Sequence, residues 1–169
     1  MKITSAQANK MLKKLMREYN DLLMLEDKTK TYLAAVGEDP ESVRPAYSYA
    51  DTREKATALA ADIRTLKHAI NVFNSTVKVP GFDMTIDEML VFIPQMNEKV
   101  ARLDQMKSAL PKERVETYGR ANANLIDYRY ANYDIAQVEK DYVCAADTLA
   151  RAQLALDSVN STETFEFEF

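Results

Sequence analysis

Apolar residues recur at steps of three and four along most of the chain, which is the spacing of one face of an α-helix. The longest unbroken run has seven such positions: Ala56, Leu59, Ile63, Leu66, Ile70, Phe73 and Val77. Its average step of 3.5 residues predicts a long helix that starts near Asp51 or Thr52 and supercoils gently against a partner helix.

A first helix is predicted to begin at residues 4–5, where Thr4 and Ser5 are both suitable N-caps. Its apolar face is wide enough for more than one neighbour and comprises Ala8, Met11, Leu12, Leu15, Met16, Tyr19, Leu22 and Leu23. The pattern weakens over 26–29 and resumes at Leu33 and Val36. We therefore expect this helix to end at Gly37, which is a good C-cap residue, and a loop to follow over 37–49.

The stretch 66–90 predicts the end of one helix, a tight connection and the start of the next. Pro80 presets its backbone angle and Gly81 adopts angles that other residues avoid, so the chain turns there. Thr85 and Glu88 then have the spacing of a capping box, in which each satisfies a free helix N–H group of the other. We interpret the stretch as a helical hairpin.

Two more helices complete the helical set. The third is predicted from Thr85 to about Leu110, with a kink at Pro94, because proline cannot donate to the carbonyl of Leu90. The last begins at Asp134, a plausible N-cap, and ends near residues 160–161.

Period-two alternation predicts two strands. Residues 125–131 alternate apolar and polar side chains, and the tail 164–169 alternates phenylalanine with glutamate. An unpaired aromatic edge would promote aggregation, so we expect the tail to pair with 125–131, or with its copy in a second subunit. Residues 111–123 are predicted to form a loop.

The predicted fold is therefore mainly α, with long antiparallel helical hairpins that form a coiled-coil-like bundle of four helices. A minor two-stranded antiparallel element formed by 125–131 and 164–169 accompanies it. Residues 1–169 are expected to form a single helical domain. The first helix and the aromatic tail carry more apolar surface than one partner covers, which predicts a homo-oligomer, most simply a dimer.

Composition and charge narrow the class of protein. Apolar residues make up 47% of the chain and charged residues 28%, which is typical of a folded domain. The net charge of −4 provides no overall attraction for nucleic acid, which is therefore not an expected partner. No apolar stretch is long enough to span a membrane, and the N-terminus lacks the pattern of a signal peptide. The single cysteine, Cys144, fits a reducing compartment, so we expect a cytoplasmic protein.

No pattern in the sequence predicts catalysis. The three glycines are far apart, so there is no phosphate-binding loop, and Cys144 adjoins predicted core positions, which indicates a packing role. Asp83, Asp87 and Glu88 lie together at a helix start; they could bind a metal ion, but acidic residues there usually interact with the helix dipole. We predict no catalytic, cofactor-binding or metal-binding residues.

The candidate interaction surface comprises Lys112, Arg114, Tyr118, Arg120 and His68. Glutamates interleave with the basic residues and weaken their field, and His68 points away from the core stripe of its helix. Tyr118, together with Tyr128, Tyr130 and Tyr133, could stack on nucleic-acid bases. We favour the alternative in which they pack on a helix with their hydroxyl groups at the rim.

Several short motifs lie at the helix junctions and at the C-terminus: Ile70-Asn71, Asn74-Ser75-Thr76, Gly81, Met84-Thr85-Ile86-Asp87-Glu88 and Val159-Asn160-Ser161-Thr162-Glu163. These motifs, and the order of the predicted elements, resemble the septicolysin-like family of uncharacterised bacterial helical proteins. The resemblance implies a bacterial helical protein and supplies no activity and no catalytic residue.

The sequence thus predicts a structural or protein-interaction protein that does not act as an enzyme. Two alternatives stay open. One is a nucleic-acid-associated accessory protein that uses the basic and tyrosine-rich segment 112–133. The other is an enzyme that depends on a carboxylate-bound metal ion.

Overall fold

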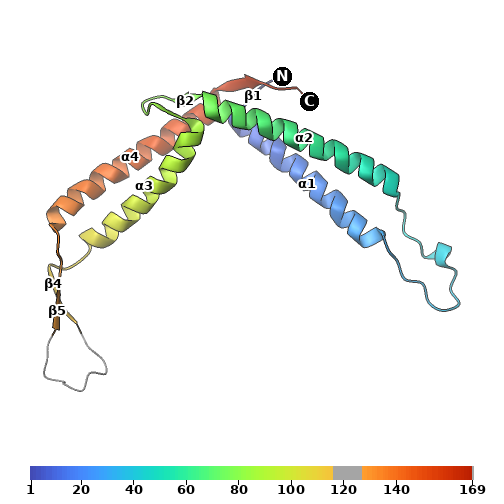
Figure 1. Ribbon diagram of the computed structural model, residues 1–169, viewed down its shortest axis with the longest axis horizontal. Helices are drawn as coiled ribbons and strands as arrows, with labels where there is room; N and C mark the ends of the chain where they lie inside the picture. Colours follow the sequence, from blue (N-terminus) through green and yellow to red (C-terminus); the bar gives the residue numbers. More distant parts are fainter. Residues whose placement is uncertain (116–126, 169) are drawn as a thin grey trace, which may run out of the picture. The chain divides into compact units, whose positions relative to one another are not determined.

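The structure of the protein is a computed structural model, and it describes residues 1–115 and 127–168. These residues form four long helices, α1 (Ser5–Thr29), α2 (Tyr49–Thr76), α3 (Ile86–Lys107) and α4 (Ile135–Thr162), and short antiparallel strand pairs that adjoin the helix ends (Figure 1). The predicted fold class is confirmed. Backbone contacts group the chain into two compact units, Met1–Val77 with Ser158–Phe169, and Lys78–Asp157. The single domain over residues 1–169 stays a prediction.

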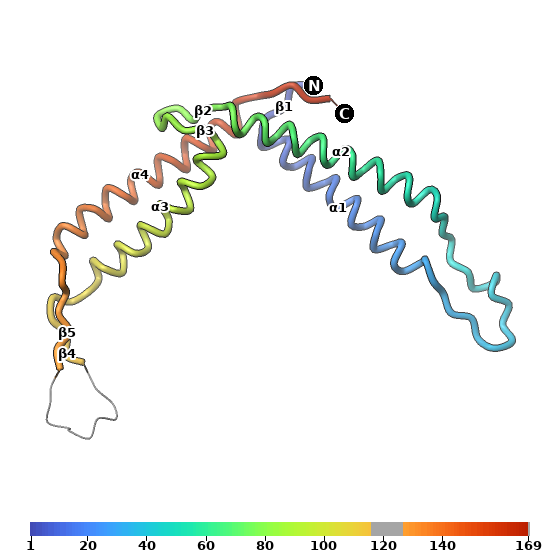
Figure 2. The backbone as a smooth tube through the Cα atoms, viewed as in Figure 1, coloured from blue at the N-terminus to red at the C-terminus, as the bar shows by residue number. Residues whose placement is uncertain are grey.

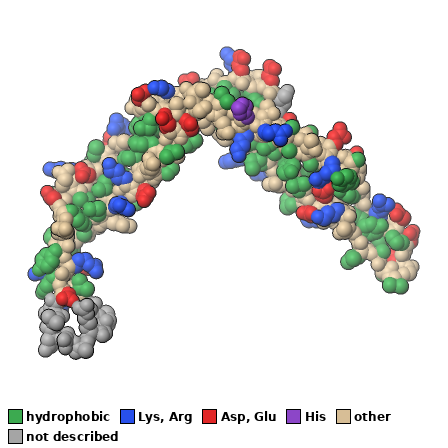
Figure 3. Space-filling view, in the orientation of Figure 1, with side chains coloured by type: hydrophobic (Ala, Val, Ile, Leu, Met, Phe, Trp, Pro, Cys, Tyr) green, Lys and Arg blue, Asp and Glu red, His purple; other side chains and the backbone are tan. Residues whose placement is uncertain are grey.

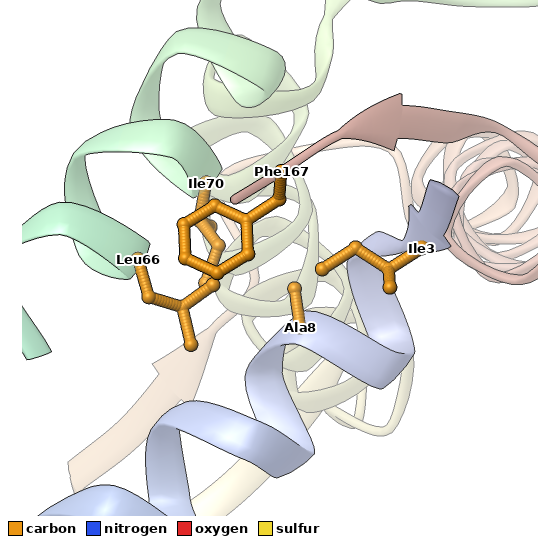
Figure 4. Packing of buried hydrophobic residues seen from close by; sticks show 5 residues of the cluster. All are labelled: Ile3, Ala8, Leu66, Ile70 and Phe167. Atoms are coloured by element: carbon orange, nitrogen blue, oxygen red, sulfur yellow. The ribbon is translucent and has the colours of Figure 1, made fainter. Parts of the chain in front are cut away.

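The first unit is built on the pair formed by α1 and α2, which run side by side (Figure 2). Its buried cluster comprises Ile3, Ala8, Leu66, Ile70 and Phe167 (Figure 4). Half-buried side chains pack around this cluster, namely Met11, Leu12, Leu15, Ala69 and Phe165. The core of this unit therefore lies at one end of the helix pair, where the start of α1 meets the end of α2.

The start of α1 follows from local capping, and its end follows from the lack of a packing partner. At its start, the Thr4 hydroxyl accepts from the Gln7 backbone N–H, and the Gln7 side chain accepts from the Thr4 N–H, so the predicted start is confirmed. The predicted end at Gly37 is wrong, because the helix stops at Thr29. Leu33 and Val36 lie beyond it with fully exposed side chains, since α2 begins too late in the chain to cover them.

Gly37 lies in a turn and is not the C-cap of a helix. The Glu38 N–H donates to the Ala35 carbonyl at 3.1 Å, and Gly37 has a φ of 89° at the third position of this turn. A positive φ at that position is what a type II turn requires, and glycine adopts it without strain. The sequence signal for a left-handed residue was correct, but its structural context was not.

Helix α2 begins slightly earlier than predicted, with Ser48 as its N-cap. All seven of its predicted core positions are buried or half-buried, and Ala56, Leu66, Ile70 and Phe73 are the buried ones. The 3.5-residue period therefore identified the face that packs correctly along the whole helix.

The tail is paired, but with a different strand from the one predicted. Strand β6 (Thr164–Glu166) pairs antiparallel with β1 (Lys2–Thr4), with Ile3 opposite Phe165. The Met1 ammonium donates to the Phe167 carbonyl at 2.7 Å, and the Phe167 N–H donates to the Met1 carbonyl at 2.9 Å. The predicted pairing of 164–169 with 125–131 is wrong, because three residues before α1 were too few to read as a strand.

In the second unit, the connection before α3 is a small hairpin of β2 (Lys78–Val79) and β3 (Met84–Thr85). Pro80 and Gly81 occupy its central turn, Gly81 with a φ of 83°, and the Phe82 N–H donates to the Val79 carbonyl at 3.2 Å. The predicted turn is confirmed. The helical hairpin predicted over 66–90 is wrong, because α2 pairs with α1 and the helices on either side of this turn belong to different units. The chain leaves it into α3, whose packed positions Ile86 and Met89 are fully buried, and α3 continues through Pro94 to Lys107.

A second hairpin links α3 to α4. It consists of β4 (Lys112–Val115) and β5 (Asp127–Tyr130), so the predicted loop over 111–123 is wrong where β4 lies. The hydroxyl of Tyr133 donates to the Met106 carbonyl at 2.9 Å, and Asp134 caps α4 by accepting from two backbone N–H groups, as predicted. The Lys107 ammonium lies 4.0 Å from the ring centroid of Tyr142, which ties the end of α3 to the start of α4.

We predict that Phe167→Ala lowers the free energy of unfolding by about 3 kcal/mol, because it empties part of the buried cluster where the two chain ends meet. Urea denaturation followed by circular dichroism measures the change. Glu166→Gln, an exposed position of the same tail, is the control and should shift stability by less than about 0.5 kcal/mol. Equal stability of both variants and the parent would show that the tail does not hold this core.

Candidate interaction surfaces

The β4–β5 hairpin places two cationic side chains and two tyrosine side chains on one face. In its register Lys112 lies opposite Tyr130, and Arg114 lies opposite Tyr128. Residues two apart on a strand point to the same side, and directly opposed residues share a side as well. Lys112, Arg114, Tyr128 and Tyr130 therefore form one surface, which we call the tyrosine–cation face.

The tyrosine–cation face is open to solvent. Tyr128 is 45% exposed and Tyr130 is 62% exposed, and both cationic residues are exposed. The Lys112 ammonium lies 4.0 Å from the ring centroid of Tyr128 and 5.5 Å from that of Tyr130. Cation–π attraction of this kind is worth about 0.5–1 kcal/mol at an exposed site, so it holds the lysine over the rings.

The opposite side of the hairpin carries charges of both signs, because Glu113, Arg129 and Asp127 lie on it. Arg129 lies opposite Glu113, and their charged groups are 3.6 Å apart. The two sides of one small hairpin thus differ sharply: one pairs a cation with an anion, and the other carries two cations with two exposed aromatic rings.

Two of the five predicted surface residues, Lys112 and Arg114, are therefore brought together on this face. Tyr118 and Arg120 lie outside the described residues. Our expectation that Tyr128 and Tyr130 pack on a helix is wrong, because both rings are exposed on the hairpin. The alternating pattern of 125–131 already implied that these tyrosines share a side, but it could not identify β4 as their partner, because Lys112–Val115 lacks apolar alternation.

His68 lies in the first unit, on the exposed side of α2. It lines a shallow hollow of about 400 Å³ together with Ala60, Ile63, Arg64, Lys67 and Asn71. Lys and Arg side chains gather beside it on the surface (Figure 3, His68 in purple). The predicted orientation of His68, away from the core stripe, is confirmed.

The three acidic residues before and within the first turn of α3 have local partners. Asp83 pairs with the Lys78 ammonium at 2.5 Å, and this contact lowers the pKa of Asp83 and raises that of Lys78. Glu88 accepts from the Thr85 N–H at 2.7 Å, and this bond is the main reason that the pKa of Glu88 is lowered. Asp87 accepts from the Thr85 hydroxyl. Within residues 1–115 and 127–168, no three His, Cys, Asp or Glu side chains come together as metal ligands would.

Cys144 corrects another expectation. We expected a packing cysteine, but its side chain is exposed on α4. It precedes the buried Ala145 by one residue, and one helical residue is a rotation of about 100°, enough to move a side chain from the packed face to solvent.

A polar cluster that sequence reasoning missed holds the long α1–α2 connection. The Tyr47 hydroxyl donates to the Glu26 carboxylate at 2.8 Å, and Arg53 binds the same carboxylate. Burial and the neighbouring carboxylate raise the pKa of Tyr47. The three residues come from α1, the connection and α2, so no local spacing could have revealed them.

Comparison with known proteins gives a fold relationship and no function. No family model matches the chain, so the septicolysin-like resemblance stays a prediction, and no curated protein matches it. A crystal structure of a functionally unknown conserved protein from Corynebacterium diphtheriae is similar, with a TM-score of 0.63 and 17% sequence identity. The match covers 98% of this chain and 100% of that one. None of the described helices is long and apolar enough to cross a membrane.

We predict that Glu88→Gln weakens the acid sensitivity of the protein. The pKa of Glu88 is lowered in the folded state, so its contribution is present above the unfolded pKa and is lost as pH falls through the folded value. Glutamine keeps the capping hydrogen bond but does not titrate, so the melting temperature should fall less between about pH 6 and about pH 3 than in the parent.

Glu98→Gln, at an exposed position of the same helix, is the control because it removes the same charge without touching the cap. An identical acid response of Glu88→Gln and the parent would contradict the coupling.

Proposed function

We propose that this protein has a non-enzymatic, structural role in the cytoplasm, where it binds a protein partner through the tyrosine–cation face. The single observation that supports the proposal is the exposure of two tyrosines and two cations on one side of the β4–β5 hairpin. Tyrosine and arginine dominate the energetics of protein interfaces, since each combines a large contact area with directional polar groups.

The geometry of the hairpin favours a protein contact for two reasons. The tyrosines are already held by the sheet and by Lys112, so little side-chain freedom is lost when a partner covers them. Within the described part of the chain, β4 and β5 have no further strand partner, so an extended segment of a partner can add to an outer edge of this sheet. An acidic and partly apolar partner segment is complementary to such a face.

Self-association is the second part of the proposal. Val143 is 62% exposed and Leu154 is 71% exposed, and they lie eleven residues apart, about three turns, on one side of α4. Their side of α4 is opposite the positions that pack, such as Ala145 and Ala152. A homodimer that covers these apolar side chains gains their burial free energy, roughly 1.5–3 kcal/mol for each one fully covered.

The partner contact is tested by affinity capture from native lysate with two hairpin variants. We expect a protein captured by the parent to be lost with the double variant Arg114→Ser and Tyr130→Ser, because one cation and one aromatic ring of the tyrosine–cation face are truncated. The matched control is Arg129→Ser with Glu113→Ser, which changes the opposite side of the same hairpin and should retain the protein. Capture of the same proteins by all three forms would contradict the proposed contact.

Self-association is tested by sedimentation equilibrium at micromolar concentration. We expect the parent to sediment well above its monomer mass of 19.2 kDa, and Val143→Glu with Leu154→Glu to sediment at that mass. A change from an apolar to a charged side chain prevents burial without disturbing the packed side of α4. A parent protein that sediments as a 19.2 kDa species would rule out the oligomer.

A further inference from the structure

The start of the chain carries a separate electrostatic feature. Residues 1–17 contain five Lys or Arg residues and no Asp or Glu, although the whole chain has a net charge of −4. Four of these cations lie within α1 at positions i, i+3, i+4 and i+7: Lys10, Lys13, Lys14 and Arg17. This spacing places them on one side of the helix, and all four are exposed. We call this row the α1 basic stripe.

The stripe faces away from the packed side of α1. The residues of α1 that belong to the core cluster or pack on it are Ala8, Met11, Leu12 and Leu15. At 100° per residue, Lys10 and Arg17 lie on the opposite side from these positions. The stripe is therefore a solvent-facing surface that needs no change in the helix pair to reach a ligand.

Its charges repel one another within the helix. Like charges three or four residues apart cost about 0.2–0.5 kcal/mol per pair, and the stripe contains four such pairs. Other pairs with this spacing carry opposite charges, such as Lys107 with Asp104 and Arg151 with Asp147. Among the described residues, only Lys14 of the stripe has an ion-pair partner, Glu18 at 3.7 Å. The sequence thus concentrates positive charge here at the expense of helix stability.

Helix α2 has a second group with the same spacing. Arg64, Lys67, His68 and Asn71 occupy positions i, i+3, i+4 and i+7 and line the hollow described above. Residues 63–82 contain no Asp or Glu. The first unit therefore carries positive charge on both of its paired helices near the buried cluster. The tail adds carboxylates to this end, with Glu166 opposite Lys2 in the strand pair.

We propose that the α1 basic stripe binds the phosphate backbone of a nucleic-acid duplex. The four cations span about 10 Å along the helix, a length that fits the major groove or its rim, and lysine and arginine are the usual phosphate-contacting residues. Single-stranded nucleic acid is usually held by aromatic stacking, and the stripe contains no aromatic residue. This inference uses a different surface from the proposed protein contact and does not depend on it.

Fluorescence anisotropy with a labelled duplex of mixed sequence, about 20 base pairs long, tests the inference. We expect the full-length protein to bind at low salt, with an affinity that falls as salt rises. The variant Lys10→Gln, Lys13→Gln, Arg17→Gln should reduce the slope of log affinity against log salt concentration by about 2.7, because three phosphate contacts are lost. The control Lys99→Gln, Arg102→Gln, Lys140→Gln removes the same charge from exposed positions of α3 and α4 and should keep the parent slope.

Thermal melting separates binding from folding. Because the stripe repels itself, the α1 triple variant should melt at or above the temperature of the parent. Parent protein that fails to bind the duplex, an equal loss in the control, or preferential binding to single strands or to vesicles with anionic phospholipid would each overturn the inference. A lower melting temperature of the α1 variant would show that the stripe serves folding.

Discussion

The packing of the two chain ends against the α1–α2 pair is the contact on which the first unit depends. Ile3 from β1 and Phe167 beyond β6 close a cluster whose other members come from the two helices. Away from that cluster no residue of α1 is buried, because its two buried residues, Ser5 and Ala8, lie at its start. A two-helix pair exposes most of each helix surface, so a small core at one end has to supply much of the cohesion that a larger bundle would distribute.

Sequence reasoning succeeded for features that depend on residues close together in the chain. Core positions of α2, the turn at Pro80 and Gly81, and the caps at Thr4, Thr85 and Asp134 were all predictable, because each depends on side chains within a few residues of one another. The apolar period fails where nothing covers it: Leu33 and Val36 continue the spacing of α1, but no element lies over them, so the helix ends earlier. The apolar period shows that a segment could pack as a helix, but here the helix extends only as far as another element covers it.

Strand partners and surfaces were predictable only in part, for a related reason. The alternation of phenylalanine and glutamate predicts a strand in the tail. In contrast, β1 is too short and β4 too polar to show such a pattern. The tyrosine–cation face needed the register between β4 and β5, and the Glu26–Tyr47–Arg53 cluster needed three segments to meet. The α1 basic stripe, by contrast, is visible in the sequence once charges are counted along a helix face, and it is masked when charge is summed over the whole chain.

The antiparallel pairing of β1 with β6 has a consequence for how the protein is made. The first unit is discontinuous: its opening 77 residues are completed only by the segment that begins at Ser158. During synthesis the α1–α2 pair therefore leaves the ribosome with Ile3 and Leu66 lacking the cover of Phe167, while the residues of the second unit are still being added. Until Phe167 emerges, that apolar end is exposed. The speed of translation across α3 and α4 therefore sets how long the nascent chain is open to aggregation and how long a chaperone would have to hold it.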